Sequence, residues 1–146
     1  MKINANKIIM GLAIIGVLIS LYLTYVKLTS STIICGEFSD CSKVQNSKYS
    51  SVFGIPVASF GIIYYFAMFA LIYYLEHNPK SEYLKKLHLA KDLLMLWGLV
   101  FTTYLTYLEV FVIHAICLWC VGSAVVVALI AIVNVLKWRK NDLYKL

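Results

Sequence analysis

Four long apolar runs alternate with polar breaks along this chain of 146 residues. Each run is close to the roughly 20 apolar residues that an α-helix needs to cross the hydrocarbon core of a bilayer. Charged residues mark several of the breaks, as Lys7 and Lys27 do on either side of the first run. The pattern predicts an all-α membrane protein, a four-transmembrane-helix bundle. Its predicted spans are 8–26, 55–75, 93–112 and 115–136.

The predicted connections differ in length. A long outer loop, 27–54, joins the first two spans, the connection 76–92 joins the second and third, and 137–146 forms a tail. Within the second connection, 81–91 fits a short interfacial helix and a solvated basic loop equally well. A cleaved signal peptide is the alternative for the first run. The length of that run, and the lack of a small-residue cleavage site after Val26, favour a span.

Composition supports a single integral membrane domain. The chain is 62% hydrophobic and 14% charged, whereas an ordinary soluble domain has about 45–50% apolar and about 25% charged residues. A soluble fold of this size has too few interior positions for so much apolar surface. Composition therefore excludes a conventional soluble enzyme and a disordered chain.

The positive charge indicates an orientation. If both termini are cytoplasmic, ten of the 13 Lys and Arg residues fall on the cytoplasmic side, which is where the positive-inside rule places them. The net charge of +6 is then explained by topology. Nucleic-acid binding is disfavoured, because it needs basic residues gathered on one folded surface.

With this topology all four cysteines lie on the outer side. Cys35 and Cys41 belong to the long loop, and Cys117 and Cys120 form a C-x-x-C at the start of the fourth span. An even number of cysteines in an oxidising compartment indicates disulfides, with three possible pairings. Structural staples, cysteines acting as small apolar residues and a zinc site are the alternatives. The sequence predicts no metal site.

The spacing favours redox chemistry over stapling. A C-x-x-C closes too short a loop to stabilise the fold much, but a helix N-terminus lowers the pKa of a thiol such as Cys117. Cys120 lies one turn deeper, within reach of a lipid-soluble carrier. The pairs therefore predict a relay in which the loop pair exchanges with a soluble dithiol and Cys41 then meets Cys117. A quinone can take two electrons and dissolves in the bilayer.

These residues resemble the vitamin K epoxide reductase family, in particular its microbial members that oxidise thiols outside the cytoplasm. The similarity covers nearly the whole chain. It rests on the loop pair Cys35 and Cys41, the stretch CSKVQNSKYSSVFGIP with Ser47 six residues after the second loop cysteine, the run YLEVFVIHAIC and the motif CLWC.

The resemblance implies a four-helix bundle around a quinone site, with the first loop folded over its outer mouth. It implies that Cys120 contacts the quinone, that Cys117 links transiently to Cys41, and that Ser47 and Phe53 belong to the site. Animal members bind vitamin K through an asparagine and a tyrosine, and those positions hold Ser50 and Ala124 here. The quinone therefore stays open as a menaquinone, ubiquinone or vitamin K type.

The function predicted from this resemblance is membrane thiol:quinone oxidoreduction in support of disulfide-bond formation. The electron donor would be a secreted thioredoxin-fold (DsbA-like) protein. The tail is short, so we expect a stand-alone enzyme without a fused thioredoxin-like domain, in a prokaryotic cell membrane. The alternatives are a non-catalytic scaffold stapled by disulfides and a vitamin K quinone or epoxide reductase.

Quinone reduction consumes two protons, which requires a proton donor near the outer mouth. The sequence favours none of the ionisable residues predicted there, which are Glu37, Asp40, Glu109 and His114.

Overall fold

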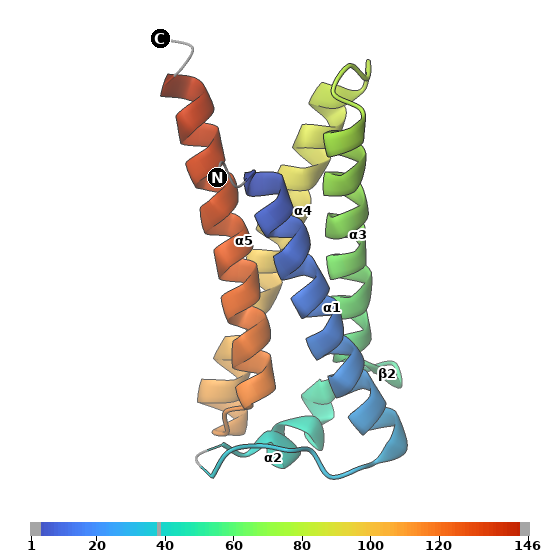
Figure 1. Cartoon of the computed structure of the whole chain (residues 1–146). Helices are drawn as coiled ribbons and strands as arrows, with labels where there is room; N and C mark the ends of the chain where they lie inside the picture. The colour runs from blue at the N-terminus through green and yellow to red at the C-terminus, as the bar shows by residue number, and fades with distance from the viewer. Residues whose placement is uncertain (1–3, 38, 144–146) are drawn as a thin grey trace.

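The structure, a computed structural model, describes residues 4–37 and 39–143 and shows four long helices in one bundle (Figure 1). The helices are α1 (Ala5–Thr29), α3 (Val57–His77), α4 (Leu84–Tyr107) and α5 (Leu118–Leu143). A six-residue π-helical segment, η2 (Leu108–Ile113), continues α4. Four helical stretches are long and apolar enough to cross a membrane. The predicted all-α, four-helix membrane architecture is confirmed.

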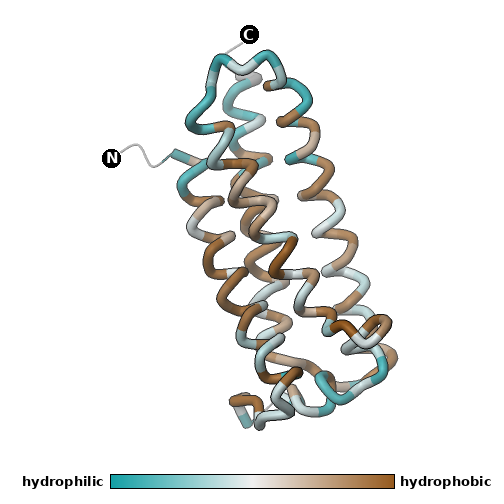
Figure 2. Tube along the Cα trace, turned by 90° about the vertical axis from the view of Figure 1, so that its right-hand side faces the viewer, coloured by the Kyte–Doolittle hydropathy of each residue, from teal (hydrophilic) through white to brown (hydrophobic). Residues whose placement is uncertain are grey.

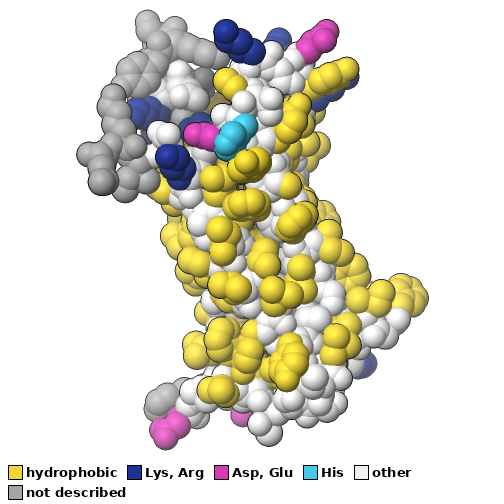
Figure 3. All heavy atoms as spheres, turned by 45° about the vertical axis from the view of Figure 1, so that its right-hand side comes forward, with side chains coloured by type: hydrophobic (Ala, Val, Ile, Leu, Met, Phe, Trp, Pro, Cys, Tyr) yellow, Lys and Arg dark blue, Asp and Glu magenta, His cyan; other side chains and the backbone are white. Residues whose placement is uncertain are grey.

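Apolar side chains cover the outside of the bundle. Figure 2 shows hydrophobic residues along the middle of the helices and hydrophilic residues concentrated at one end. In Figure 3, hydrophobic side chains form a broad belt, and Lys and Arg gather mainly beyond one edge of it. Large apolar side chains such as Leu18, Phe66 and Val100 are more than 60% exposed. Such a surface is stable in lipid, where exposed apolar groups cost nothing.

The helices extend beyond the apolar runs. The α4 helix begins at Leu84 and continues without interruption into the third apolar run. Residues 84–91 are therefore the first turns of a long helix, and neither a separate interfacial helix nor a solvated loop describes them. Hydropathy alone places the start of this helix too late, because Lys85, Lys86 and Lys91 interrupt the apolar pattern.

The cysteine end of the bundle, which we define as the end that carries α2, is closed by the segment between α1 and α3 (Figure 1). This segment contains α2 (Cys41–Gln45), η1 (Lys48–Ser50) and a hairpin of β1 (Ser51–Val52) and β2 (Ile55–Pro56). The strands pair antiparallel, with Ser51 opposite Pro56. The opposite end, where α3 ends and α4 begins, is called the far end below.

Helix α1 packs against both α3 and α5, and α4 contacts the same two helices from the other side of the bundle (Figure 1). The helices approach closely at Gly16, where a Cβ atom would overlap the ring of Tyr65. The Tyr65 hydroxyl lies 2.7 Å from Ser123 Oγ on α5. Tyr65 of α3 thereby links α1 and α5 within the bundle, because the glycine at position 16 leaves room for its ring.

Candidate redox site

The structure brings the four cysteines together. Cys35 and Cys41 form a disulfide with a Cα–Cα distance of 6.2 Å, and Cys117 and Cys120 are free thiols. Cys41 and Cys117 are core members of one apolar cluster, against which Cys35 and Cys120 also pack. Cys41 and Cys117 are 76 positions apart in the sequence, yet both pairs lie in one packed cluster at the cysteine end.

The four sulfurs differ in exposure. Cys41 and Cys117 are 1% and 0% exposed, whereas Cys35 and Cys120 are partly exposed. Cys120 lines an internal cavity, whereas Cys35 does not line it. Each pair therefore joins one fully buried cysteine to one that is partly exposed.

An aromatic clamp, formed by Tyr22 and Trp119, holds the loop over the start of α5. The two rings lie 4.6 Å apart between centroids. The Tyr22 hydroxyl accepts a hydrogen bond from the N–H of Ile34 at 3.1 Å, and the Nε1–H of Trp119 donates to the Ile34 carbonyl at 2.8 Å. Both backbone groups of the residue before Cys35 are thus bound, which fixes that cysteine relative to the C-x-x-C.

Two further contacts fasten the loop beyond Cys35. The N–H of Asp40, next to Cys41, donates to the carbonyl of Ile116, next to Cys117, at 3.1 Å. Farther along, Lys27 Nζ donates to the Gln45 carbonyl and to Ser50 Oγ. These bonds join the loop to α1 and to the segment before α5, so the neighbourhood of the cysteines is held on two sides.

Cys117 immediately precedes helix α5, as the sequence predicts. Its carbonyl accepts the N–H of Val121 at 3.0 Å. The pKa of the Cys117 thiol is lowered, mainly by a hydrogen bond from the Cys120 side chain and further by the backbone N–H groups of Cys120 and Trp119, although burial opposes the shift. Hydrogen bonds to a thiolate stabilise the charged form, so Cys117 is prepared for nucleophilic exchange.

The segment before the C-x-x-C is a π-helix, which the sequence does not predict. After η2 the chain turns at His114, whose φ is 55°, and the carbonyl of Glu109 accepts the N–H of Ala115 at 3.0 Å. The turn leaves the Glu109 side chain 6% exposed. Short π-helical insertions are frequent at functional sites. The available signal was an acidic residue at the end of an apolar run, eight positions before Cys117.

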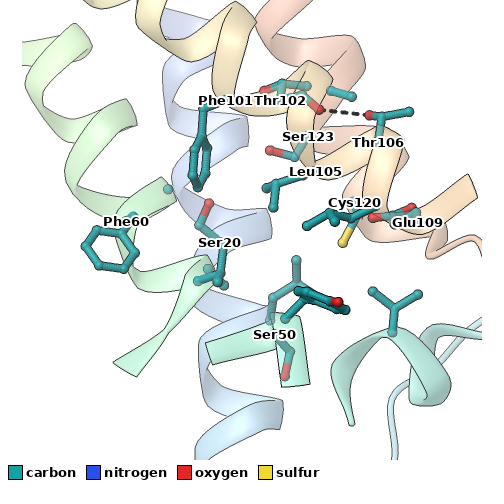
Figure 4. Close-up of a pocket in the computed structure, with 18 of the residues that line it drawn as sticks. Ser20, Ser50, Phe60, Phe101, Thr102, Leu105, Thr106, Glu109, Cys120 and Ser123 are labelled. Carbon is teal, nitrogen blue, oxygen red and sulfur yellow. Dashed lines mark hydrogen bonds between the residues drawn. The ribbon is translucent and has the colours of Figure 1, made fainter. Parts of the chain in front are cut away.

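A cavity of about 120 Å³ opens beside Cys120 (Figure 4). A cavity of this order can hold one aromatic ring. Its walls come from α1, α3, α4, α5 and the loop, and they are mainly apolar and aromatic with a few hydroxyl groups, which is typical of small-molecule sites. Lining residues labelled in Figure 4 include Ser20, Phe60, Phe101, Leu105, Cys120 and Ser123.

The structure places three of the four residues predicted for the quinone site at this cavity. Ser47 and Ser50 line it together with Cys120 and Ala124. Phe53 does not: it lies at the turn of the β1–β2 hairpin with a φ of 51° and is fully exposed. The hairpin directs this side chain away from the bundle, so the structure does not bring Phe53 to the pocket.

The predicted proton donors separate into three groups. Glu37 is exposed on the loop. Asp40 and His114 line a depression on the outer surface, and Glu109 lines both this depression and the cavity. Within residues 4–37 and 39–143, no group of three or more His, Cys, Asp or Glu side chains is arranged to hold a metal ion.

The sequence also matches a known protein family. Residues 7–135 match the model of the Vitamin K epoxide reductase family, a stretch that includes both cysteine pairs and most of all four long helices. Because the match covers most of the chain, the protein belongs to this family. Its members are oxidoreductases, and the family points to a membrane redox role that links disulfides and quinones.

Proposed function

We propose that this member of the vitamin K epoxide reductase family is a membrane thiol:quinone oxidoreductase that supports disulfide-bond formation. Electrons would enter from a secreted thioredoxin-fold (DsbA-like) protein at Cys35 and Cys41, pass to Cys117 and Cys120, and leave to a quinone. The observation that carries the proposal is the single cluster in which the four cysteines lie, with Cys35 partly exposed on the loop and Cys120 at the cavity.

The first exchange takes place at the loop disulfide. A thiolate of the partner attacks Cys35 Sγ, the more exposed sulfur of the pair, and Cys41 leaves as a thiolate. The partner's second thiolate then attacks the mixed disulfide and leaves with its own disulfide formed. Two electrons have entered the loop pair, and Cys35 and Cys41 are both reduced.

The second exchange passes the electrons inward. Cys41 attacks Cys117 Sγ in a Cys117–Cys120 disulfide, and Cys120 leaves. Cys35 then attacks Cys41 Sγ, which re-forms the loop disulfide and releases Cys117 as a thiolate. The end state has a loop disulfide and two thiols in the C-x-x-C, which are the bonds that the structure contains. The lowered pKa of Cys117 makes it a good leaving group in the last step.

The cavity fits a quinone ring held against Cys120. A quinone supplies a two-electron acceptor that dissolves in the bilayer, and menaquinone, ubiquinone and vitamin K types all have this chemistry. The aromatic residues Phe60 and Phe101 provide flat apolar walls, and Ser20 adds a hydroxyl group. The hydroxyl groups of Ser50 and Ser123 are already bonded, to Ser47 and Tyr65. The loop and η1 cover the cavity at the cysteine end and limit access of water.

The distribution of charge supports an orientation. Lys and Arg side chains gather toward the far end (Figure 3), and the positive-inside rule places such an end in the cytoplasm. Both termini would then be cytoplasmic, and the four cysteines would lie on the oxidising side of a prokaryotic cell membrane. The whole chain would form one integral membrane domain with a redox loop over 27–54.

Trapping of an intermediate tests the order of the exchanges. In Cys35→Ser, oxidation by a short-chain ubiquinone followed by gel filtration should yield a Cys41–Cys117 disulfide, because Cys35, the thiol that resolves this bond in the forward direction, is absent and Cys120 can only reverse the exchange. Peptide mapping by mass spectrometry detects the bond. The matched variant Cys41→Ser should instead form a mixed disulfide with an oxidised thioredoxin-fold protein, because the Cys35 thiolate attacks the partner's disulfide and Cys41 is absent and cannot release the partner's sulfur.

A structural role for the disulfides predicts a different result. In that case both variants would show only unpaired cysteines, the Cys35–Cys41 bond would resist mild reductant in the wild type, and dithiothreitol would not drive quinone reduction. These results together would reject the proposed function.

A further inference from the structure

Glu109 occupies an unusual position for an ionisable residue. It lies in the π-helical segment that continues a membrane-spanning helix, and its exposed fraction is 6%. Burial of a carboxyl group inside a membrane protein is costly, so such residues are commonly functional. Within the part of the chain that the structure describes, Glu109 forms no ion pair with Lys or Arg that would explain its burial.

The carboxyl group lies between the two cysteines of the C-x-x-C. Its Oε2 atom accepts the backbone N–H of Cys117 at 3.3 Å, and it lines the cavity together with Cys120. Figure 4 shows the Glu109 carboxyl group beside the Cys120 sulfur at the edge of the cavity. The carboxylate is therefore placed next to the thiol with which it would exchange a proton.

Glu109 also connects two spaces. One side of the residue lines the cavity with Cys120, and the other lines the outer depression with Asp40 and His114. Among the described residues, it is the only one that lines both. The other hydroxyl and thiol groups of the cavity belong to Ser, Thr, Tyr and Cys side chains, which are weaker acids than a carboxyl group. A carboxylate exchanges protons with solvent far more readily.

We propose that Glu109 is the proton-transfer residue of this site, which accepts the Cys120 thiol proton and carries protons from the outer depression to a quinone in the cavity. The inference rests on the proposed function and names the residue that transfers the protons of that reaction. Two thiols and one quinone give one disulfide and one hydroquinone, so two electrons leave the sulfurs and two protons reach the hydroquinone oxygens. One proton comes from Cys120 through Glu109. The proton lost by Cys117 goes to the outer solvent, and an equivalent one enters through Glu109.

Infrared difference spectroscopy tests the role without a quinone. The loop disulfide is already formed, so the thiol oxidant diamide acts on Cys117 and Cys120 in purified protein. We expect the carbonyl band of a protonated carboxyl group to change on oxidation, and this change to disappear in Glu109→Gln. The control Glu82→Gln, the same substitution at an exposed residue of the far end, should retain it. Retention of the full change in Glu109→Gln would overturn the inference.

Single-turnover kinetics with a short-chain ubiquinone provide a second measurement. Loss of a general acid or base slows proton transfer by about 10²–10⁴-fold, so Glu109→Gln should slow oxidation of the two thiols by at least about 10²-fold. Reduction of the Cys35–Cys41 disulfide by dithiothreitol should keep its wild-type rate in the same variant.

The outcomes separate the two proposals. If wild-type thiols react with ubiquinone and Glu109→Gln reacts at the same rate, the inference fails and the proposed function stands. If the wild type does not react with any quinone but its carboxyl band responds to diamide, the proposed function fails instead. If circular dichroism shows that Glu109→Gln does not fold, Glu109→Asp retains a carboxyl group. It should then show a shifted band and an intermediate rate, and wild-type values of both would overturn the inference.

Discussion

The two ends of the bundle use buried polar groups in different ways. At the far end, Lys91 and Asn134 are each 7% exposed. Lys91 Nζ donates to Asn134 Oδ1, and it forms an ion pair with Asp92 at 3.1 Å. At the cysteine end, Glu109 is equally buried but accepts only a backbone N–H, and it borders two hollow spaces, one of which it shares with Cys120.

A second set of polar side chains at the far end also bonds across helices. Asn6 on α1 donates to Glu76 on α3 and accepts from Lys137 on α5. These contacts join α1, α3 and α5, while Lys91 and Asn134 join α4 to α5. Polar side chains that satisfy one another across helices stabilise a membrane bundle. The polar side chains of the far end therefore stabilise the packing of the helices, whereas the buried carboxyl group of the cysteine end stays next to two open spaces.

Removal of the Cys120 sulfur, which lies at the cavity, tests the role of the cysteine end and has the largest expected effect. Cys120→Ala should reduce quinone reduction by dithiothreitol by on the order of 10⁴-fold or more, the scale on which loss of a covalent nucleophile acts. Thermal unfolding in detergent should change little, because Cys120 is a small, partly exposed side chain. Quinone reduction at the native rate in this variant would show that the assigned role of Cys120 is wrong.

Removal of a polar partner at the far end should have the opposite profile. Asn134→Leu leaves the Lys91 ammonium with only Asp92 as a side-chain partner, and interhelical hydrogen bonds in membranes contribute about 0.6–1.7 kcal/mol. We expect a loss of about 1–2 kcal/mol in the free energy of unfolding, measured by denaturant titration in detergent. The rate of quinone reduction per folded molecule should equal that of the wild type. A specific loss of activity without destabilisation would remove the distinction between the two ends.

A titration of Cys117 has the smallest expected effect. Because its pKa is lowered chiefly by the Cys120 side chain, its thiolate should form at a lower pH than that of an ordinary cysteine. In Cys120→Ala the midpoint should move to higher pH. The group favours the folded state above the ordinary thiol pKa, and this contribution is lost as the pH falls through the lowered value. Ultraviolet absorbance of the thiolate, with Cys117→Ser as the blank, measures the midpoint. An unchanged midpoint would contradict the hydrogen-bond explanation.

The apolar pattern predicts the four helices because crossing a bilayer requires a minimum length that is visible in one dimension. The same reasoning places all four cysteines on one side, and the structure gathers them in one cluster. The start of α4 at Leu84 is not predictable in this way, since polar residues beyond the hydrocarbon region continue a helix without an apolar signal. The π-helical segment at 108–113 has no such signal either.

Residue types alone also do not show which way a side chain faces. Ser47 and Ser50 reach the cavity, whereas Phe53, only three residues after Ser50, faces outward at the turn of a hairpin. The left-handed backbone at Phe53 and Gly54 closes that turn, and its direction depends on how β1 and β2 lie against the bundle.

By itself, the sequence determined the class of the protein and the number of long apolar helices, and it predicted the reactive sulfurs, because hydropathy and cysteine spacing are properties of the linear chain. Only the tertiary structure decided which sulfur faces the cavity, that Glu109 lies between Cys120 and an outer depression, and that the far end is joined by polar pairs. Those features depend on the rotation and closeness of helices, which arise when distant segments pack against one another.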